Sequence, residues 1–341
     1  MDKNGVNKSQ NYIAEGFLQG LDLDKRFDQI ISEISDEIGF IPSGMISTSN
    51  WWGSKIFGAF HCWGKFQNKR AVLKVQGVKP ETSEIEMIGL FNAQNKSQLI
   101  RPPKLYTTIP WSNEKRYEAL IMEDVGDKKI LNEPTNNKEV KRFFKIFLEY
   151  REKCRNKPWL KKPDESIGEM IRTRFEKWRK SSWEIYPNHP LRKKGDVKLI
   201  DQAIEILAEK YHGVEWEFQH GHLSDGDLYE ISDGQIVVLS NLYWSWRAPF
   251  YDAIFAYHWF IYHLVEIDGI TPEKIERQRE LWLKEIFRLF GKNNRLLRLA
   301  LLERAAAGLN LDALSVDPKL PIAKYLVEKT RKEVRYLIDE I

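Results

Sequence analysis

The chain has 341 residues, of which 42% are hydrophobic and 12% aromatic, and its formal net charge is +4. This length and composition predict a packed globular protein of two domains or lobes, and they exclude a disordered chain. The two cysteines, Cys62 and Cys154, exclude a disulfide framework and have no metal-ligand spacing, so we expect a reducing compartment.

The N-terminus, MDKNGVNKSQ, is polar and has no apolar signal-peptide core. The longest apolar run, residues 253–265, is too short to span a bilayer and is interrupted by His258 and His263. We therefore expect a soluble, cytoplasmic protein without a membrane partner.

The first half of the chain predicts a small lobe of mixed helix and strand. Residues 1–15 form an expected loose tail. In chain order we expect one or two helices over 17–38, strands over 55–61 and 70–76, a helix over 81–92, and a strand over 117–122. Pro102, Pro103 and Pro110 interrupt the region before the last strand.

The second half is mainly helical by its apolar period. We expect helices over 138–154, 165–183, 197–211, 272–290, 295–308 and 322–341. A hairpin is expected inside this region, with Ser232-Asp233-Gly234 as its turn between residues 228–231 and 235–239.

Positive charge is concentrated in residues 138–198, which hold 19 Lys and Arg against nine Asp and Glu. Aromatic residues are interleaved with these charges. Such a surface can bind nucleic acid or an acidic partner. The alternative is a solvated helical surface whose aromatic side chains face inward, and no nucleic-acid-binding module accompanies the charge.

The segment from His220 to Asp252 is the most informative one, and it reads HGHLSDGDLYEISDGQIVVLSNLYWSWRAPFYD. His220-Gly221 and Gly226 keep the frame of an HGDLHPGN loop, and Pro249-x-Tyr251-Asp252-Ala253 follows at the expected place. The segment resembles the catalytic centre of the aminoglycoside phosphotransferase and choline kinase family. The resemblance implies a structural role for His220 and Asp252.

Three earlier features stand in the order of that family. Ala71-Val72-Leu73-Lys74-Val75 resembles the strand whose lysine pairs the nucleotide phosphates. Glu84 stands where the glutamate partner of that lysine is found, with Glu86 as the alternative register. Residues 120–126, LIMEDVG, resemble the hinge between the lobes, so the resemblance implies that the backbone of Met122, Glu123 and Asp124 holds the adenine of ATP.

The sequence departs from the family at the positions of the catalytic and magnesium-binding residues. The resemblance places His222 where the catalytic Asp belongs, Asp227 where the first magnesium-binding Asn belongs, and Ser240 where the second magnesium-binding Asp belongs. Asn241, which follows, is a poor substitute. The phosphate-covering loop, expected over 47–60, has Trp51 and Trp52 where small residues let backbone amides approach phosphate. Asp225 occupies the family's Pro position.

Two outcomes stay open for this site. His222 can accept the substrate proton as a neutral imidazole, or it can position the hydroxyl, and Asp227 can hold one Mg²⁺. These roles would make a rewired kinase. Ser240, however, brings no charge to a second metal ion. The loss of the carboxylate at this position predicts a catalytically incompetent site.

A zinc site is a further alternative, with His220 and His222 as ligands and Asp225 as a third. Two histidines without a second ligand cluster seldom bind zinc. The aromatic cluster of Tyr243, Trp244 and Trp246 either plugs the nucleotide cleft or packs the larger lobe.

The sequence thus predicts an α+β, bilobal protein-kinase-like fold. We expect a tail with helices over 1–39, a β-rich N-lobe over 40–125, and a large helical C-lobe over 126–341 that carries the catalytic-loop-like segment 218–252. The leading hypothesis is a pseudokinase that acts through binding or scaffolding and engages a nucleotide weakly or not at all, with ATP and Mg²⁺ as conditional cofactors. The alternatives are an ATP-dependent kinase of small-molecule hydroxyls and a binder of nucleic acid or an acidic partner on a kinase scaffold.

Overall fold

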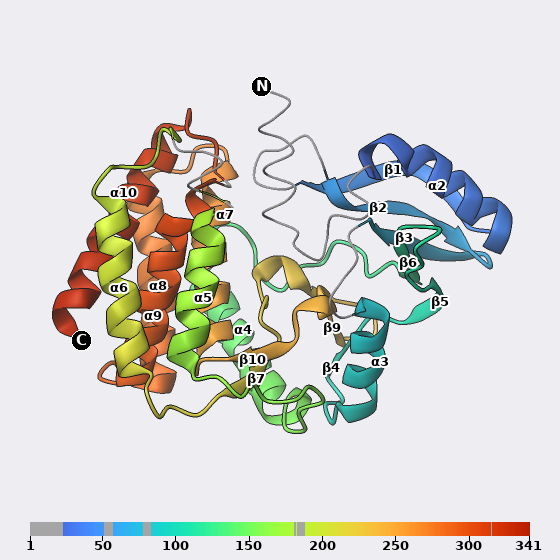
Figure 1. The fold of residues 1–341 in the computed structure, drawn as a ribbon. Helices are drawn as coiled ribbons and strands as arrows, with labels where there is room; N and C mark the ends of the chain where they lie inside the picture. Colours follow the sequence, from blue (N-terminus) through green and yellow to red (C-terminus); the bar gives the residue numbers. More distant parts are fainter. Residues whose placement is uncertain (1–22, 51–56, 78–82, 181, 183–187, 315) are drawn as a thin grey trace. The chain divides into compact units, whose positions relative to one another are not determined.

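The computed structural model describes residues 23–50, 57–77, 83–180, 182, 188–314 and 316–341 (Figure 1). The chain divides into two compact units. The first contains Met1–Ala93, Arg101–Asp127 and Val237–Leu242, and the second contains Gln94–Ile100, Lys128–Ile236 and Tyr243–Ile341.

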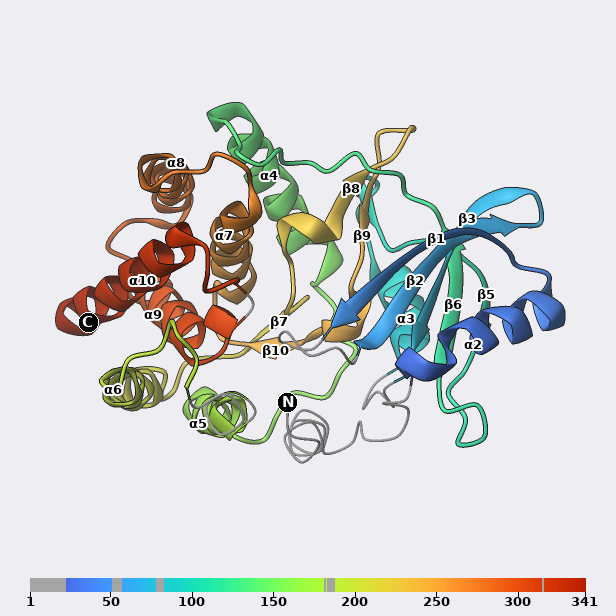
Figure 2. The same ribbon diagram turned by 90° about the horizontal axis from the view of Figure 1, so that it is seen from above.

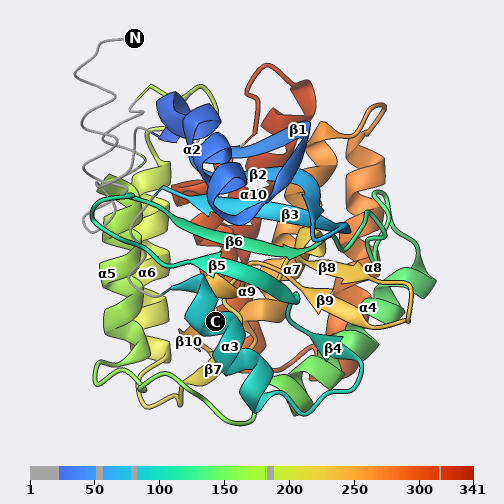
Figure 3. The ribbon, with the colours of Figure 1, turned by 90° about the vertical axis from the view of Figure 1, so that its right-hand side faces the viewer.

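The first unit is built on an antiparallel sheet of five strands in the order β1-β2-β3-β6-β5. Its strands are β1 (Ile41–Asn50), β2 (Phe57–Phe66), β3 (Lys69–Gln76), β5 (Leu105–Ile109) and β6 (Glu118–Glu123). Helix α2 (Leu23–Ile38) covers one face, where Ile30 and Ile34 join Phe60 and Leu73 in a hydrophobic core (Figure 3). Helix α3 (Glu84–Gln94) follows β3.

One strand of this sheet, β1, was not expected from the sequence, and another, β5, was expected only as a strand between the helix and the last strand, without a residue range. β1 reads IPSGMISTSN, and residues 41–47 are exposed throughout, so no alternation of apolar and polar residues marks it as a strand. β5 lies between prolines that we interpreted as interruptions. The phosphate-covering loop expected over 47–60 is shorter, because Ser47 lies in β1 and Gly58 in β2; Trp51 and Trp52 lie outside the described residues.

The second unit is mainly helical, and the helices expected from the sequence are confirmed with shifted ends. They are α4 (Asn137–Glu149), α5 (Ile167–Arg179), α6 (Asp196–Lys210), α8 (Pro272–Phe290), α9 (Arg295–Asn310) and α10 (Pro321–Glu340). α9 is the central helix, because it packs against α5, α6, α7 and α10 (Figure 2). The α-helix expected to reach Cys154 ends at Glu149 and continues as a π-helical turn, Tyr150–Cys154.

Helix α7 (Tyr251–His263) was not predicted as a helix. Its side chains are buried nearly all round, so it has no polar face and no amphipathic period. Among the described residues, none of the helices combines the length and the apolar character needed to cross a bilayer.

Four short strands carry the segment of interest, and a fifth, from residues 100–101, pairs with one of them. β7 (Glu217–Gln219) pairs with β10 (Ser245–Arg247), and β4 (Ile100–Arg101), β9 (Ile236–Val238) and β8 (Leu228–Glu230) form a sheet in the order β4-β9-β8. The expected hairpin is confirmed. Its turn has Gly234 at φ +82°, a conformation that favours glycine.

Candidate functional site

Lys74 lies on β3 and forms an ion pair with Glu84 at the start of α3, with 2.5 Å between Nζ and Oε2. Gln76, two residues along the strand, donates to the same Oε2 at 2.7 Å. Glu86, the alternative partner, is exposed. The side chains of Lys74 and Glu84 are 13% and 4% exposed, so this is a largely desolvated pair. Burial, and then the charge of Lys74, lower the pKa of the neighbouring His61 to about 3, which keeps that imidazole neutral.

Glu118, at the start of β6, holds the first turn of α3. Its Oε1 accepts from the backbone N–H of Glu84 at 3.2 Å, and its Oε2 accepts from the Ser83 hydroxyl. Burial raises the pKa of Glu118, with the charge of Glu84 adding to it, although the hydrogen bonds from Ser83 and Glu84 oppose the shift. No local pattern in the sequence indicated this role, because Glu118 stands 34 residues from its partner.

The hinge residues end β6, and two of their side chains are engaged within the first unit. Glu123 forms a two-pronged ion pair with Arg101, and its backbone N–H donates to the Lys104 carbonyl at 2.9 Å. Asp124 pairs with Arg70 at 2.6 Å. Met122 is buried in the sheet. The backbone N–H of Glu123 is therefore already committed to β5 and its preceding turn, not open to an adenine ring.

In the second unit, Asp252 clamps the loop that follows β7. Its Oδ2 accepts from the His220 N–H at 2.9 Å and from the Tyr150 hydroxyl at 2.6 Å, and its Oδ1 accepts from the Gly221 N–H at 2.8 Å. Burial, and then the charge of Asp252, raise the pKa of Tyr150 well above its usual range. Asp252 is fully buried and fixes the loop backbone, a structural role.

Gly221 is required at this bend. Its φ is +78°, and a Cβ at this position would lie 2.5 Å from the Tyr243 carbonyl oxygen. His220 is buried and packs edge-on against Trp244 at 5.3 Å between ring centres.

Asp227, in the next turn (Asp225–Asp227), is bound by its own loop. Its Oδ2 accepts from the Ser224 N–H at 2.8 Å and the Ser224 hydroxyl at 2.5 Å, and it lies 3.3 Å from His222 Nδ1. Burial alone would raise the pKa of Asp227, but the charge and hydrogen bond of His222, with the Ser224 hydrogen bond, lower it to about 2. The carboxylate at the metal-ligand position is therefore ionised and already hydrogen-bonded.

His222 is held between aromatic rings. It stacks on Tyr243 at 4.5 Å and contacts Phe255 at 5.0 Å, and its side chain is 37% exposed. Of the aromatic cluster, Trp244 is buried against Tyr150 and Phe218. Trp244 thus packs the interior of the helical unit, which agrees with the packing interpretation for this residue.

The proposed zinc ligands are not brought together. Asp225 instead faces His263, with 3.1 Å between Oδ1 and Nδ1, while His222 faces Asp227. Glu133, Asp225 and His263 form the single group of potential metal ligands found among the described residues, with ligand atoms within 4.8 Å of one another. Lys129 already pairs with Glu133 at 2.9 Å, so the group contains its own cation.

Ser240 has the left-handed φ of +57°, and Asn241 donates its side-chain amide to the Val238 carbonyl at 2.8 Å. Both belong to Val237–Leu242, which groups with the first unit. At this position the chain thus offers a neutral hydroxyl and an amide whose nitrogen is turned back onto its own strand.

The basic stretch 138–198 directs most of its aromatic side chains inward. Phe143, Phe144, Phe147, Tyr150 and Phe175 are buried. Many of its cations are paired on the surface: Arg142 with Glu230, Lys162 with Glu215, Arg172 with Glu205, and Arg179 with Asp201. These contacts favour the interpretation of a solvated helical surface.

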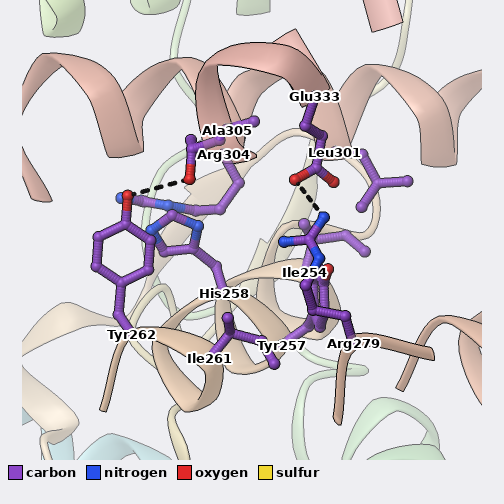
Figure 4. Close-up of a pocket in the computed structure, with 11 residues that line it drawn as sticks. Ile254, Tyr257, His258, Ile261, Tyr262, Arg279, Leu301, Arg304, Ala305 and Glu333 are labelled. Atoms are coloured by element: carbon purple, nitrogen blue, oxygen red, sulfur yellow. Dashed lines mark hydrogen bonds and ion pairs between the residues drawn. The ribbon is translucent and has the colours of Figure 1, made fainter. Parts of the chain in front are cut away.

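A small cavity lies between α7, α8, α9 and α10 (Figure 4). Arg279 pairs with Glu333 at 2.7 Å on its wall, and His258 and Arg304 line it. Its volume of about 10 Å³ is the size of one water molecule, so it does not admit a substrate.

No protein-family model matches the sequence, and no curated protein is significantly similar to it. Solved structures do resemble the fold. The apo form of a thermostable mutant of aminoglycoside phosphotransferase APH(4)-Ia is 10% identical, with a TM-score of 0.58 over 91% of this chain and 98% of that one. The chain has the protein-kinase-like fold.

Two further structures carry the same fold. An amicoumacin kinase is 12% identical, with a TM-score of 0.51 over 92% of this chain and 95% of that chain. Choline kinase from Streptococcus pneumoniae is 10% identical, with a TM-score of 0.50 over 91% of this chain and 99% of that chain. The fold class predicted from the sequence is confirmed, and so is the resemblance to aminoglycoside phosphotransferases and choline kinases. At these identities the likeness establishes the fold alone.

Proposed function

We propose that this chain is a pseudokinase, a protein on a phosphotransferase fold that acts by binding, with weak nucleotide binding and no phosphoryl transfer. The observation that carries the proposal is the pairing of His222 with Asp227 at 3.3 Å. The two residues that replace the catalytic Asp and a metal ligand satisfy each other.

The donor set does not fit the two magnesium ions that kinase-like enzymes use. Mg²⁺ binds through carboxylates and demands near-octahedral geometry. Asp227 is one carboxylate, and three donors converge on its Oδ2. Ser240 supplies no charge, and Asn241 turns its amide nitrogen to Val238.

The residues of the first unit that would contact a nucleotide support nucleotide binding more than phosphoryl transfer. The Lys74–Glu84 pair, fixed by Gln76 and Glu118, presents an ammonium group held in one place. Related structures hold ADP with hygromycin B, and AMP-PNP with Ca²⁺. A nucleotide phosphate contacting Lys74 would need no metal ligand from the second unit.

The test is a search for turnover. The purified protein is incubated with Mg-ATP and a panel of aminoglycosides, choline and fructosamines, and ADP formation is compared with that of the Lys74→Ala variant. We expect no ADP above that background. ADP formation that is abolished in Asp227→Ala and faster in Ser240→Asp would contradict the proposal and establish the rewired kinase.

A further inference from the structure

Three arginine side chains gather at one aromatic ring in the helical unit. The guanidinium groups of Arg247, from β10, and Arg174, from α5, lie 5.1 Å and 5.5 Å from the centre of the Tyr251 ring. Arg304, from α9, places its Nη1 3.5 Å from the Tyr251 hydroxyl. Three elements that are distant in sequence therefore direct cations to the first residue of α7.

Two of these cations have carboxylate partners, and the third does not. Arg174 pairs with Glu303, and Arg304 pairs with Asp312. Arg247 forms no ion pair and no side-chain hydrogen bond within the part of the chain that the structure describes. Glu303 and Asp252 attract it electrostatically.

Neither nearby carboxylate forms an ion pair or a hydrogen bond with Arg247, although Glu303 Oε2 is buried and has no hydrogen-bond partner among the described residues. Glu303 is bound to Arg174, and the oxygens of Asp252 accept from Tyr150 and from the loop amides. The charge of Arg247 is thus met by no hydrogen-bond acceptor among the described residues.

The arginines also leave donors unused. Nε of Arg247, Nε and Nη1 of Arg174, and Nε of Arg304 are out of contact with solvent and have no acceptor among the described residues. Burial lowers the pKa of Arg247, with the charge of Arg174 adding to the effect. Buried donors without acceptors are costly and uncommon in folded proteins, so a cluster of them calls for an acceptor from outside the chain.

We propose that Arg247 and Arg174 bind the oxyanion, a carboxylate or phosphate, of a small ligand beside Tyr251. The guanidinium fork matches both groups with paired hydrogen bonds. The Trp178 ring, 5.0 Å from the Arg174 guanidinium, and the Tyr251 ring keep the forks oriented. This inference goes beyond the proposed function and does not depend on nucleotide binding.

The site adjoins the loop that Asp252 clamps. A Cβ at Gly221 would lie 3.2 Å from Arg247 Nε, and the backbone of Arg247 lies opposite that of Glu217 where β10 and β7 pair, just before this loop. An anionic ligand at Arg247 would therefore contact the backbone that carries His222 and Asp227.

If Arg247 instead has a purely structural role, held by the Tyr251 ring, its replacement should lower the stability of the protein, whereas an anion-binding role predicts no loss of stability. Arg247 is half-buried. Replacing a half-buried charge that has no acidic partner by an apolar residue of similar length should be neutral or stabilising, whereas removing a structural cation should be destabilising. The melting temperature of Arg247→Met in chloride buffer therefore separates the two interpretations before any ligand is added.

The test is a titration with sodium phosphate, and separately with malonate, at constant ionic strength set by chloride. Binding is followed by the melting temperature and by calorimetry. We expect a stabilising shift in the unmodified protein and at least tenfold weaker binding in Arg247→Met, which is about 1.4 kcal/mol. Arg277→Met, which removes an exposed arginine of the same unit, should bind as the unmodified protein does.

The two probes distinguish the source of the oxyanion. Binding of phosphate but not malonate assigns the site to a phosphorylated ligand, binding of malonate but not phosphate assigns it to a carboxylate, and binding of both shows a site for either oxyanion. Equal affinity in Arg247→Met, an equal loss of affinity in Arg277→Met, or no binding of either probe would overturn the proposal. Failure of Arg247→Met to fold, with Arg247→Lys stable but unchanged in anion binding, would also overturn it.

Discussion

His222 and Asp227 face each other across a single turn, with 3.3 Å between the imidazole Nδ1 and the carboxylate Oδ2. In an active kinase-like site these positions serve the substrate hydroxyl and a magnesium ion. Here the carboxylate also accepts two hydrogen bonds from Ser224. The pairing of His222 with Asp227 and the two hydrogen bonds from Ser224 stabilise this turn.

The first prediction concerns the contribution of Asp227 to stability. Its pKa in the folded state, about 2, is below the ordinary value of 3.8, so its ionised form stabilises the fold above that value. The stabilisation is then lost as the pH falls toward 2. We expect Asp227→Asn to cost about 2 kcal/mol at neutral pH, and about half of this at pH 3.

Urea unfolding at several pH values measures this cost. The exposed Asp268→Asn serves as the control and should change stability little at any pH. A cost for Asp227→Asn that is constant down to pH 3 would contradict the assigned pairing.

The second prediction concerns the bend at Gly221. Gly221→Ala introduces both a strained φ and a clash with the Tyr243 carbonyl. Gly213 has a similar φ of +72° but open space around it, so Gly213→Ala isolates the cost of the φ alone. We expect Gly221→Ala to destabilise by at least ~2 kcal/mol more than Gly213→Ala, as measured by chemical denaturation. Equal losses would show that the loop relaxes away from Tyr243.

The third prediction concerns the Tyr150 hydroxyl, which donates to Asp252 and accepts from the His220 N–H. Tyr150→Phe leaves a buried carboxylate with one donor fewer. We expect a loss of about 1–2 kcal/mol. Tyr336→Phe, at a site 60% exposed, should cost nearly nothing. If thermal unfolding gave the same stability for both variants, Asp252 alone would hold the loop.

The fourth prediction concerns Glu118. Its carboxylate caps α3 through the Glu84 N–H and the Ser83 hydroxyl, so Glu118→Ala should lower the stability of the first unit by about 1–2 kcal/mol. Glu118→Gln keeps an acceptor oxygen and should retain most of that stability. The exposed Glu114→Ala is the matched control in urea unfolding. Identical losses in the Ala and Gln variants would indicate that the charge of Glu118, and not its cap, is what matters.

A helix or strand could be predicted from the sequence where its pattern of apolar residues lies within the element itself. The strand with Lys74 and the amphipathic helices were predictable because apolar period is a local property. α7 was not, because a helix buried all round carries no such period. β1 was not, because both of its faces are exposed over residues 41–47.

The side-chain network of the site depends on contacts that are distant in sequence. Tyr150 and Asp252 are 102 residues apart, and Asp225 and His263 are 38 apart. The spacing of His220, His222 and Asp225 indicated a ligand set that the fold separates, because His263 at the end of α7 takes Asp225. The motif frame thus located the loop, but the partners of its residues required the structure.

A nucleotide that binds without phosphoryl transfer needs no metal ion from the second unit, so the metal dependence of nucleotide binding is the first measurement to make. ATP is titrated by calorimetry in Mg²⁺ and in EDTA, with Lys74→Ala alongside. We expect weak binding of equal affinity in both buffers, lost in Lys74→Ala. Binding that requires Mg²⁺ and is abolished by Asp227→Ala would contradict this expectation, because the second unit would then hold a metal ion as an active kinase does.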